Sequence, residues 1–274
     1  MSHVLPTFII AGAGKSGTSY LANRLSEHKD IYVPFCKEPA FFSTWPGRGN
    51  YSRGISWYQK NFCDYRGQRH ICDASTVYMY DPSSPALIKA QLGVIPLIFI
   101  LRDPIKRVYS NYWQEIKAGN SLPGFDESIN KNGKRAKEMF LASQYDVHLN
   151  RYLEFFPRNN IHILIYEELI ADPTVVLRET LEHLQLPFDV GEMRFLSQDN
   201  YAAAPSFPFI ASLLRNSSLI QPIKTLLPPS MRRPSKKILE TLRTLSQKKV
   251  SYPSMSYEAE SILKDCLKNT YDNL

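Results

Sequence analysis

The stretch that constrains this chain most is an apolar run that leads into a glycine-rich turn. The run covers residues 7–11, the turn covers residues 12–17, and apolar residues then recur at helical spacing from Tyr20. This order predicts a strand, an anion-binding turn and a helix at 18–27. The unpaired N–H groups and positive dipole end of a helix N-terminus suit a phosphate or sulfate, and Lys15 adds a full positive charge. The turn therefore predicts an anionic ligand.

Three kinds of anion-binding turn compete for this stretch. A Walker A loop has a glycine directly before its lysine, as Gly14 is here, and another one earlier, where this chain has Ile9. Gly12, Gly14 and Gly17 match the G-x-G-x-x-G pattern of dinucleotide-binding turns, although no acidic residue clearly ends a second strand about 20 residues on. The third kind is the 5′-phosphosulfate loop of sulfotransferases, which Lys15-Ser16-Gly17-Thr18-Ser19 resembles residue for residue. A glycine-rich turn without a ligand is the remaining alternative.

Length and charge fit a folded enzyme or binding module with an anionic partner. The chain has 274 residues, enough for one domain with a full core. Its net charge of +7 at pH 7 favours an anionic partner but does not choose between a nucleotide, a nucleic acid and a polyanionic sugar.

Neither a membrane span nor a secretory signal is predicted. The longest apolar run, Ile95–Leu101, is far shorter than the ~20 residues that cross a bilayer, and no basic region with a long apolar stretch opens the chain. The cysteines show no metal-ligand spacing and are expected to be reduced thiols; they are Cys36, Cys63, Cys72 and Cys266. We expect a cytoplasmic protein without a bound metal and without a membrane or nucleic-acid partner.

Strand and helix patterns alternate over residues 7–186, which predicts an α/β fold with a parallel sheet and helices on both faces. The expected strands are 7–11, 31–33, 71–75, 96–101 and 161–166, and the expected helices are 18–27, 84–92, 104–118, 139–155 and 173–185. Three other stretches are predicted as loops: 35–42, which enters a helix, 44–57, which is rich in aromatic residues and covers a site, and the polar stretch 120–135.

A second candidate anion site follows the strand predicted at 96–101. Asp103 is a suitable N-cap and Pro104 a suitable first residue for the next helix, so Arg102 stands where the strand leaves the sheet. Ligands of open α/β sheets bind at the carboxyl ends of strands, where the glycine-rich turn also lies. Arg102 offers a planar fork of donors to a phosphate, and Ser110 offers a hydroxyl two helical turns on. Together the two sites predict a nucleotide with a phosphate at each end.

This second stretch carries the firmest resemblance. Residues 97–110 resemble the 3′-phosphate motif of sulfotransferases that use 3′-phosphoadenosine-5′-phosphosulfate (PAPS), with the motif's arginine and serine at Arg102 and Ser110. Residues 155–173 resemble a later block of the heparan-sulfate sulfotransferase branch, and the similarity extends over about residues 7–188. The resemblance implies a P-loop-kinase-like α/β fold, with PAPS as cofactor and the 3′,5′-diphosphate PAP as product. The cofactor-binding residues that it implies are Gly14, Lys15, Ser16, Gly17, Thr18, Ser19, Tyr20, Arg102 and Ser110.

A catalytic base is also implied. In the heparan-sulfate branch a glutamate is separated by two residues from a Phe-Phe pair, and Glu38-Pro39-Ala40-Phe41-Phe42 matches that spacing. An acceptor hydroxyl or amine loses a proton as it attacks sulfur, and a carboxylate within reach can take it. Lys15 would stabilise charge on the leaving diphosphate. A solvated or ion-paired carboxylate is the alternative for Glu38, and His70 and His148 are then the remaining candidates for the base.

The chain departs from that branch around the acceptor. Ala40 and Ser43 replace polar residues that some glycosaminoglycan enzymes carry beside the glutamate, and Ala74 stands where they have a lysine. A late lysine-glycine-arginine loop is absent, and the pair Lys236–Lys237 is the candidate substitute. With a cytoplasmic location and the aromatic-rich stretch 41–58, these departures favour a small acceptor, such as a bacterial-type secondary metabolite. A carbohydrate acceptor of the glycosaminoglycan type is the alternative.

Two other classes of protein are weighed against a sulfotransferase. A P-loop-like small-molecule kinase lacks support because the early Walker A glycine is missing. A non-enzymatic polyanion-binding module would use residues 205–250, which hold nine Lys or Arg and one acid. That segment is either an irregular solvated stretch or a cationic lid. We expect one sulfotransferase domain over 1–274, with a core at 7–188 and a lid-like segment at 189–274; the oligomeric state is not predicted.

Overall fold

The computed structural model describes residues 4–35, 37–118, 120–130, 134–188, 203–205, 247–249 and 252–273. The chain divides into two compact units. The first unit comprises Met1–Arg107, Phe140–Phe195 and Cys266–Leu274, and the second comprises Val108–Met139 and Leu196–Asp265.

The first unit is built on a parallel sheet, as the alternating pattern predicted. Its strand order is β2-β3-β1-β4-β5, and every neighbouring pair in it is parallel. The strands are β1 (Phe8–Gly12), β2 (Ile31–Tyr32), β3 (His70–Ala74), β4 (Leu97–Leu101) and β5 (Ile161–Ile165). Because parallel neighbours require crossover connections, the sheet confirms the predicted α/β class.

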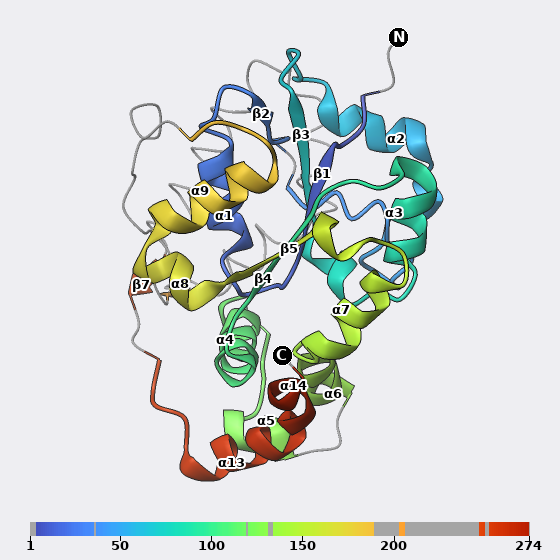
Figure 1. Ribbon diagram of the computed structural model, residues 1–274. Helices are drawn as coiled ribbons and strands as arrows, with labels where there is room; N and C mark the ends of the chain where they lie inside the picture. Colours follow the sequence, from blue (N-terminus) through green and yellow to red (C-terminus); the bar gives the residue numbers. More distant parts are fainter. Residues whose placement is uncertain are drawn as a thin grey trace. The chain divides into compact units, whose positions relative to one another are not determined.

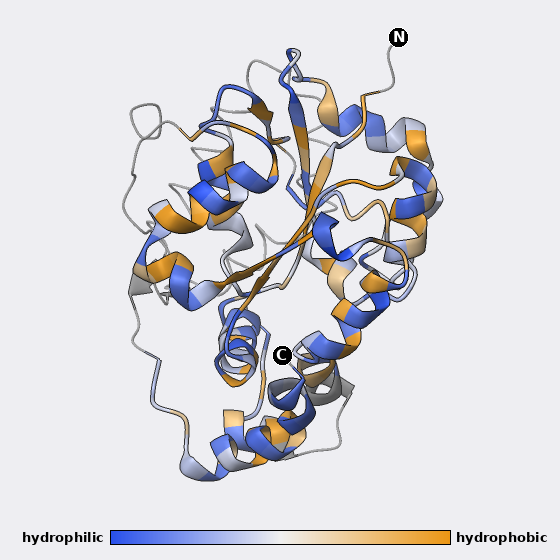
Figure 2. Cartoon of the chain, in the orientation of Figure 1, coloured by the Kyte–Doolittle hydropathy of each residue, from blue (hydrophilic) through white to orange (hydrophobic). Residues whose placement is uncertain are grey.

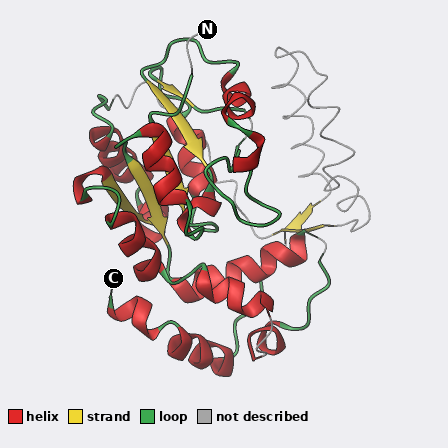
Figure 3. Cartoon of the chain, turned by 90° about the vertical axis from the view of Figure 1, so that its right-hand side faces the viewer, coloured by secondary structure: helices red, strands yellow, loops and turns green. Residues whose placement is uncertain are grey.

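Helices cover both faces of this sheet (Figures 1 and 3). On one face lie α1 (Thr18–Leu25), α8 (Tyr166–Ala171) and α9 (Pro173–His183). On the other lie α2 (Ile55–Gln59), α3 (Ser84–Leu92) and α7 (Tyr145–Leu153), with the 3-10 turns η2 (Lys60–Phe62) and η3 (Thr76–Met79). Further 3-10 turns are η1 (Tyr51–Arg53) and η4 (Arg158–Asn160).

The central strands β1 and β4 are apolar throughout because both of their faces are buried. In β1, Phe8 and Ile10 belong to the core beneath α1 and α9, whereas Ile9 and Ala11 belong to the core on the opposite face. All five residues of β4 are buried as well, as expected for a central strand of a parallel sheet. Figure 2 shows the hydrophobic colour continuing along the central strands while the flanking helices alternate.

Two predicted boundaries were wrong between the fourth and fifth strands. The helix expected at 139–155 is two helices, α6 (Lys134–Leu141) and α7, and the loop expected at 120–135 contains α5 (Phe125–Asn130) and the start of α6. The backbone leaves the helical conformation at Gln144, with φ −80° and ψ 70°. Just before it, the buried Ser143 hydroxyl accepts a hydrogen bond from Arg107 Nε (2.5 Å). A tertiary contact therefore interrupts a pattern that looked continuous in the sequence.

The aromatic stretch after β2 also differs from expectation. Instead of a helix after residues 35–42 and a loop over 44–57, a loop leads to η1 and then to α2. Phe41, Phe42 and Tyr58 are at most 2% exposed in the core, where Phe41 stacks on Tyr58 and Phe42 meets both rings edge-to-face. These rings contribute to folding rather than to a wall that an acceptor could contact.

The second unit continues α4 (Pro104–Lys117), which begins in the first unit as predicted, and holds α5. Its described part includes an antiparallel pair, β6 (Ala203–Pro205) with β7 (Gln247–Lys249), and most of α13 (Tyr257–Cys266). Residues 189–202 and 206–246, including Lys236–Lys237 and most of the expected lid, lie outside the described residues. Among the described helices, none combines the length and apolar character needed to cross a membrane.

The last described helix, α14 (Lys268–Asp272), belongs to the first unit. Thr270 Oγ1 donates to Asp146 Oδ1 on α7 (3.0 Å), and the Tyr271 hydroxyl donates to Asp103 Oδ2 (3.0 Å). The other oxygen of Asp103 accepts from Lys106 N–H (2.8 Å), so Asp103 caps α4 as expected.

Candidate active site

The turn after β1 leads directly into the N-terminus of α1. The first N–H bonded within the helix is that of Leu21, which donates to the carbonyl oxygen of Gly17 (3.0 Å). The N–H groups of Gly17 and of the first turn of α1 are therefore not used by the helix itself. Gly17 has φ +87°, and a Cβ there would lie 3.1 Å from the Tyr166 ring. The turn thus needs glycine at this position, and it presents backbone donors at the positive end of a helix.

The preceding glycines differ in how closely they are packed. A Cβ on Gly12 would lie 2.6 Å from Met79 Cβ, which no side-chain rotation of Met79 relieves. A Cβ on Gly14 would meet Thr76 Oγ1 at 3.6 Å, an ordinary contact. Lys15, next in the turn, has φ +74° although it is not glycine. Such strained backbone tends to occur where the surrounding structure holds a functional group in place.

Two arginines hold the carbonyl groups of this turn. Arg102 Nη1 donates to the Lys15 carbonyl oxygen (3.2 Å), and Arg107 Nη1 donates to the Gly14 carbonyl oxygen (3.3 Å). Arg107 is 2% exposed and was not predicted as a site residue. With the carbonyl oxygens occupied by these cations, the turn is left to present its N–H groups to an anion.

Arg102 retains capacity to bind a further group. Its guanidinium carbon lies 4.5 Å from the centre of the Tyr166 ring, and its buried Nε has no hydrogen-bond partner within the described ranges. A phosphate oxygen would satisfy such a donor, so Arg102 fits a nucleotide phosphate. Ser110 belongs to the second unit, whereas Arg102 belongs to the first, so their predicted pairing on one phosphate stays a prediction.

The hydroxyl groups predicted around Lys15 have different environments. Ser16 is fully buried and Thr18 is 5% exposed, so both side chains pack inside the turn. Ser19 is exposed on the first turn of α1, and Tyr20 is half-buried against the core with Arg24 over its ring. The hydroxyl of this set that faces outward at the helix N-terminus is that of Ser19.

Glu38 lies on a turn after β2 that is bonded to the end of β3. Its N–H donates to the Ala74 carbonyl oxygen (3.2 Å), and its Oε2 accepts from Thr76 Oγ1 (3.3 Å). A Cβ on Gly14 would meet Thr76 Oγ1 at 3.6 Å, so the Glu38 carboxylate and the turn after β1 share Thr76 as a neighbour. The Glu38 side chain is 46% exposed and its backbone has φ +59°. The turn therefore presents an accessible carboxylate from a strained backbone.

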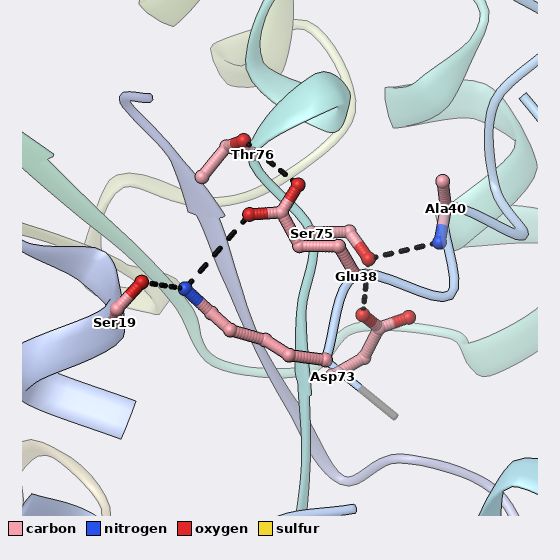
Figure 4. Close-up of polar contacts among 7 residues, drawn as sticks. Ser19, Glu38, Ala40, Asp73, Ser75 and Thr76 are labelled. Atoms are coloured by element: carbon pink, nitrogen blue, oxygen red, sulfur yellow. Dashed lines mark hydrogen bonds and ion pairs between the residues drawn. The ribbon is translucent and has the colours of Figure 1, made fainter. Parts of the chain in front are cut away.

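Lys37 connects this carboxylate to helix α1. Its Nζ donates to Ser19 Oγ (2.5 Å) and lies 3.8 Å from Glu38 Oε1, as the dashed lines at Ser19 and Glu38 in Figure 4 show. The candidate base and the candidate cofactor loop are thus joined through one ammonium group.

The two histidines considered as alternative bases lie in other environments. His70 is the first residue of β3, whereas Glu38 contacts the last, about 13 Å away along the strand. The Nδ1 atom of His70 contacts Thr7 Oγ1 (3.2 Å). His148 is 4% exposed, and its Nε2 contacts the Leu141 carbonyl oxygen (2.6 Å). Neither contact involves the Glu38 turn or the turn after β1.

Three residues around the site were not singled out from the sequence: Arg107, Lys37 and Thr76. Arg107 lies within the motif at residues 97–110 and Lys37 directly precedes Glu38, so their closeness to motif residues was the available signal. Thr76 follows β3 without a recognisable pattern, because its contacts join segments 38 residues apart.

A glycine-rich turn after β1 at a helix N-terminus and an arginine after the neighbouring strand β4 are the arrangement of a P-loop-like α/β protein. Comparison with known families makes this class specific. The sulfotransferase domain family matches residues 5–206, and the chain belongs to that family. It is therefore an enzyme of the sulfotransferase family, and PAPS is the cofactor of that family. The match decides against the kinase and the non-enzymatic module that the sequence left open.

Individual relatives agree with this assignment. The chain is 30% identical to mouse heparan sulfate glucosamine 3-O-sulfotransferase 5 over 191 residues, covering 67% of this chain and 54% of that protein. It is 27% identical over 216 residues to bifunctional heparan sulfate N-deacetylase/N-sulfotransferase 1 of Caenorhabditis elegans, covering 74% of this chain and 24% of that protein. The chain spans about half the length of the first of these relatives.

Solved structures show the same fold. A sulfotransferase from Alicyclobacillus acidocaldarius superimposes with a TM-score of 0.64 at 28% identity, covering 72% of this chain and 88% of that one. The sulfotransferase domain of the curacin biosynthetic pathway, at 14% identity and a TM-score of 0.51 over 96% of this chain and 98% of that one, supports the fold alone.

Proposed function

We propose that the chain transfers a sulfuryl group to a hydroxyl or amine of an acceptor, with Glu38 as the general base and Lys15 stabilising the leaving diphosphate. PAPS, when bound, supplies the activated sulfuryl group. The observation that carries the proposal is the junction at α1, where Lys37 connects Glu38 to Ser19 on the first turn of the helix. Sulfuryl transfer needs a general base for the attacking group close to the site that holds the phosphosulfate. This junction brings the Glu38 carboxylate next to the helix end proposed to hold it.

The remaining residues of the turn act on the cofactor's phosphates. The N–H groups of Gly17 and of the first turn of α1 would hold the 5′-phosphosulfate, supported by the charge of Lys15 and the dipole of the helix. Gly14, Ser16, Thr18, Ser19 and Tyr20 complete this loop. Arg102, with Ser110 as predicted, would hold the 3′-phosphate, and the unpartnered Nε of Arg102 supports that role.

The base acts on the acceptor rather than on the cofactor. Glu38 is nearly half exposed, so an acceptor can approach its carboxylate. The carboxylate takes the proton of the acceptor hydroxyl or amine as that group attacks sulfur, which raises the nucleophilicity of the acceptor at the moment of attack. Thr76, which donates to Oε2, restricts the orientations open to the carboxylate.

Two acceptor classes follow from different observations. A small molecule was expected in part from the aromatic stretch 41–58, but three of those rings are core residues and that support is weaker. A saccharide hydroxyl or amine is favoured by the names of the relatives, which act on heparan sulfate. Transfer from PAPS to heparan-type oligosaccharides and to small phenols and alcohols, measured side by side, distinguishes the two classes.

The domain organisation and the location of the protein are proposed from the sequence alone. We propose that residues 1–274 work as one sulfotransferase domain in which 189–274 includes a cationic lid. The basic charge of 205–250 supports the lid, since the cofactor is an anion. The cytoplasmic location and the absence of nucleic-acid and membrane partners stay predictions.

Ligand-induced stabilisation tests the proposed function. PAP should raise the melting temperature more than ATP or NAD at equal concentration, because a ligand that binds the folded state stabilises it by linkage. Arg102→Ala should remove most of the PAP shift, because a charged donor to a bound phosphate contributes about 1.5–3 kcal/mol. Arg178→Ala is the matched control, because Arg178 also lies over an aromatic ring, that of Phe188, but on α9. Equal stabilisation by ATP, or an unchanged PAP shift in Arg102→Ala, would contradict the assignment.

A further inference from the structure

A buried carboxylate beneath the Glu38 turn organises three hydroxyl groups. Asp73, at the end of β3, is 0% exposed. Its Oδ1 accepts from Ser75 Oγ (2.6 Å), and its Oδ2 accepts from the hydroxyls of Tyr58 (2.6 Å) and Tyr78 (2.8 Å). Burial raises the pKa of Asp73 to about 6, an effect to which the Glu38 charge adds and which the three hydroxyls oppose. Near neutral pH the group is an anion that fixes the direction of each hydroxyl proton.

Two of these hydroxyls hold the backbone of the segment that carries Glu38. Ser75 Oγ accepts from the Ala40 N–H (3.0 Å), and the Tyr78 oxygen accepts from the Phe42 N–H (3.2 Å). A hydroxyl has one proton to donate, and in both residues it is donated to Asp73. The lone pairs of each hydroxyl oxygen are therefore left to accept a hydrogen bond from these N–H groups. Figure 4 shows the chain of contacts from Asp73 through Ser75 to Ala40.

The segment needs such support because its backbone is strained. Glu38 has φ +59° and Ala40 has φ +51°, both in the left-handed region that L-residues rarely adopt. Such a conformation is unfavourable and persists only where surrounding contacts hold it. The bond from Ala40 N–H to Ser75 fixes the far side of this turn, and the bond from Glu38 N–H to Ala74 fixes the near side.

We propose that Ser75 is a positioning residue for Glu38: its hydroxyl, oriented by Asp73, holds the Ala40 N–H and thereby keeps the Glu38 carboxylate in the conformation that accepts the acceptor's proton. The inference rests on the proposed role of Glu38 as the base. Ser75 itself is fully buried, so it would act through the turn rather than on the acceptor.

Ser43 provides a closely matched control within the same segment. Like Ser75, it is 0% exposed, donates to a buried aspartate (Asp81 Oδ2, 2.5 Å) and accepts a backbone N–H (Trp45, 3.1 Å). It differs in holding residues that follow the Phe-Phe pair, beyond the strained turn. Loss of a buried hydroxyl is therefore common to Ser75→Ala and Ser43→Ala, and loss of support for the Glu38 turn is specific to the first.

The test measures single-turnover release of PAP from PAPS, with water as the acceptor and with any acceptor found by the side-by-side comparison. Ser75→Ala should lower the rate about tenfold or more while PAP affinity stays within about twofold, and Ser43→Ala should leave both within about twofold. In a Glu38→Gln background, Ser75→Ala should have no further effect, because the group it positions is gone. Ser75→Cys, which keeps the size with a weaker acceptor, gives the same comparison if the alanine variant does not fold.

The outcomes separate this inference from the proposed function. If Glu38→Gln keeps the wild-type rate, the proposed base fails, and the inference fails with it. If Glu38→Gln loses activity but Ser75→Ala keeps the wild-type rate, or lowers it equally in both backgrounds, the positioning role is wrong while the base stands.

Discussion

At the scale of single residues, both proposed catalytic side chains extend from left-handed backbone, with φ +74° at Lys15 and +59° at Glu38. In neither case is the residue a glycine, so each conformation is maintained by its contacts. The Lys15 carbonyl is held by Arg102, and the Glu38 N–H is held by Ala74. Strain of this kind fixes the direction of a side chain before the substrate arrives, which lowers the reorganisation needed during reaction.

The two residues should fail in different ways when they are changed. Glu38→Gln keeps the shape but cannot take a proton, so turnover should fall by roughly 10²–10⁴ while PAP affinity barely changes. Lys15→Ala should lower both, because one charge serves the bound cofactor and the leaving group. Glu154→Gln, an exposed carboxylate at the end of α7, is the control. A Glu38→Gln enzyme within about threefold of wild type in single-turnover transfer would end the general-base assignment.

The motif residues of the candidate site could be proposed from the sequence, whereas the residues that contact them could not. Lys15, Glu38 and Arg102 stand in short patterns whose chemistry can be read locally. Thr76 and Arg107 act through contacts that span 38 and 93 residues, and such contacts leave no periodic signal.

At the scale of elements, the close packing of β1 against η3 means that Gly12 and Gly14 should differ in how well they tolerate a side chain. Gly12→Ala would force Cβ against Met79 Cβ and should lower the free energy of unfolding by about 1–3 kcal/mol. Gly14→Ala meets an ordinary contact and should leave stability within about 0.5 kcal/mol, whatever it does to cofactor binding. Urea unfolding of both variants checks the difference, and equal stabilities would show that Met79 moves away at little cost.

The strands and most helices were predictable because burial on both faces leaves continuous apolar runs. Ser84–Leu92 matches its predicted range, and Leu97–Leu101 differs by one residue at its start. The failures share a cause: at Ser143 and in the aromatic stretch after β2, tertiary contacts decide the local structure. Tyr166 begins α8, where the apolar run predicted that the strand continued.

At the scale of the whole molecule, buried titratable groups make stability depend on pH. Burial lowers the pKa of His148 to about 4, and the charges of Arg151 and Arg107 add to this. The unfolded chain therefore binds more protons between pH 4 and 6.5, so this group's contribution is present above pH 6.5 and is lost as pH falls. From pH 7 to pH 5 the loss is about 2 kcal/mol. Asp73 has the opposite sign, because its raised pKa favours the folded state on acidification, and it offsets part of the loss.

Replacing His148 should flatten this dependence. His148→Gln removes the titrating group, so its free energy of unfolding should fall less between pH 7 and pH 5 than that of the wild type. Urea unfolding at the two pH values gives the slopes, and any constant effect of the substitution cancels in the comparison. Parallel slopes would show that His148 does not carry the acid sensitivity.

The main chain of the segment from Ala40 to Trp45 is anchored to another part of the chain, in addition to the contacts that its buried side chains make. The N–H groups of Ala40, Phe42, Thr44 and Trp45 bond to Ser75, Tyr78 and Asp81, which belong to a different part of the chain. A backbone N–H is the same whichever residue carries it, proline excepted. Outward positions such as the exposed Thr44 can therefore change in evolution, or in the laboratory, while the path of the segment is preserved. Substitutions at such outward positions therefore leave intact the backbone bonds that hold the segment next to Glu38.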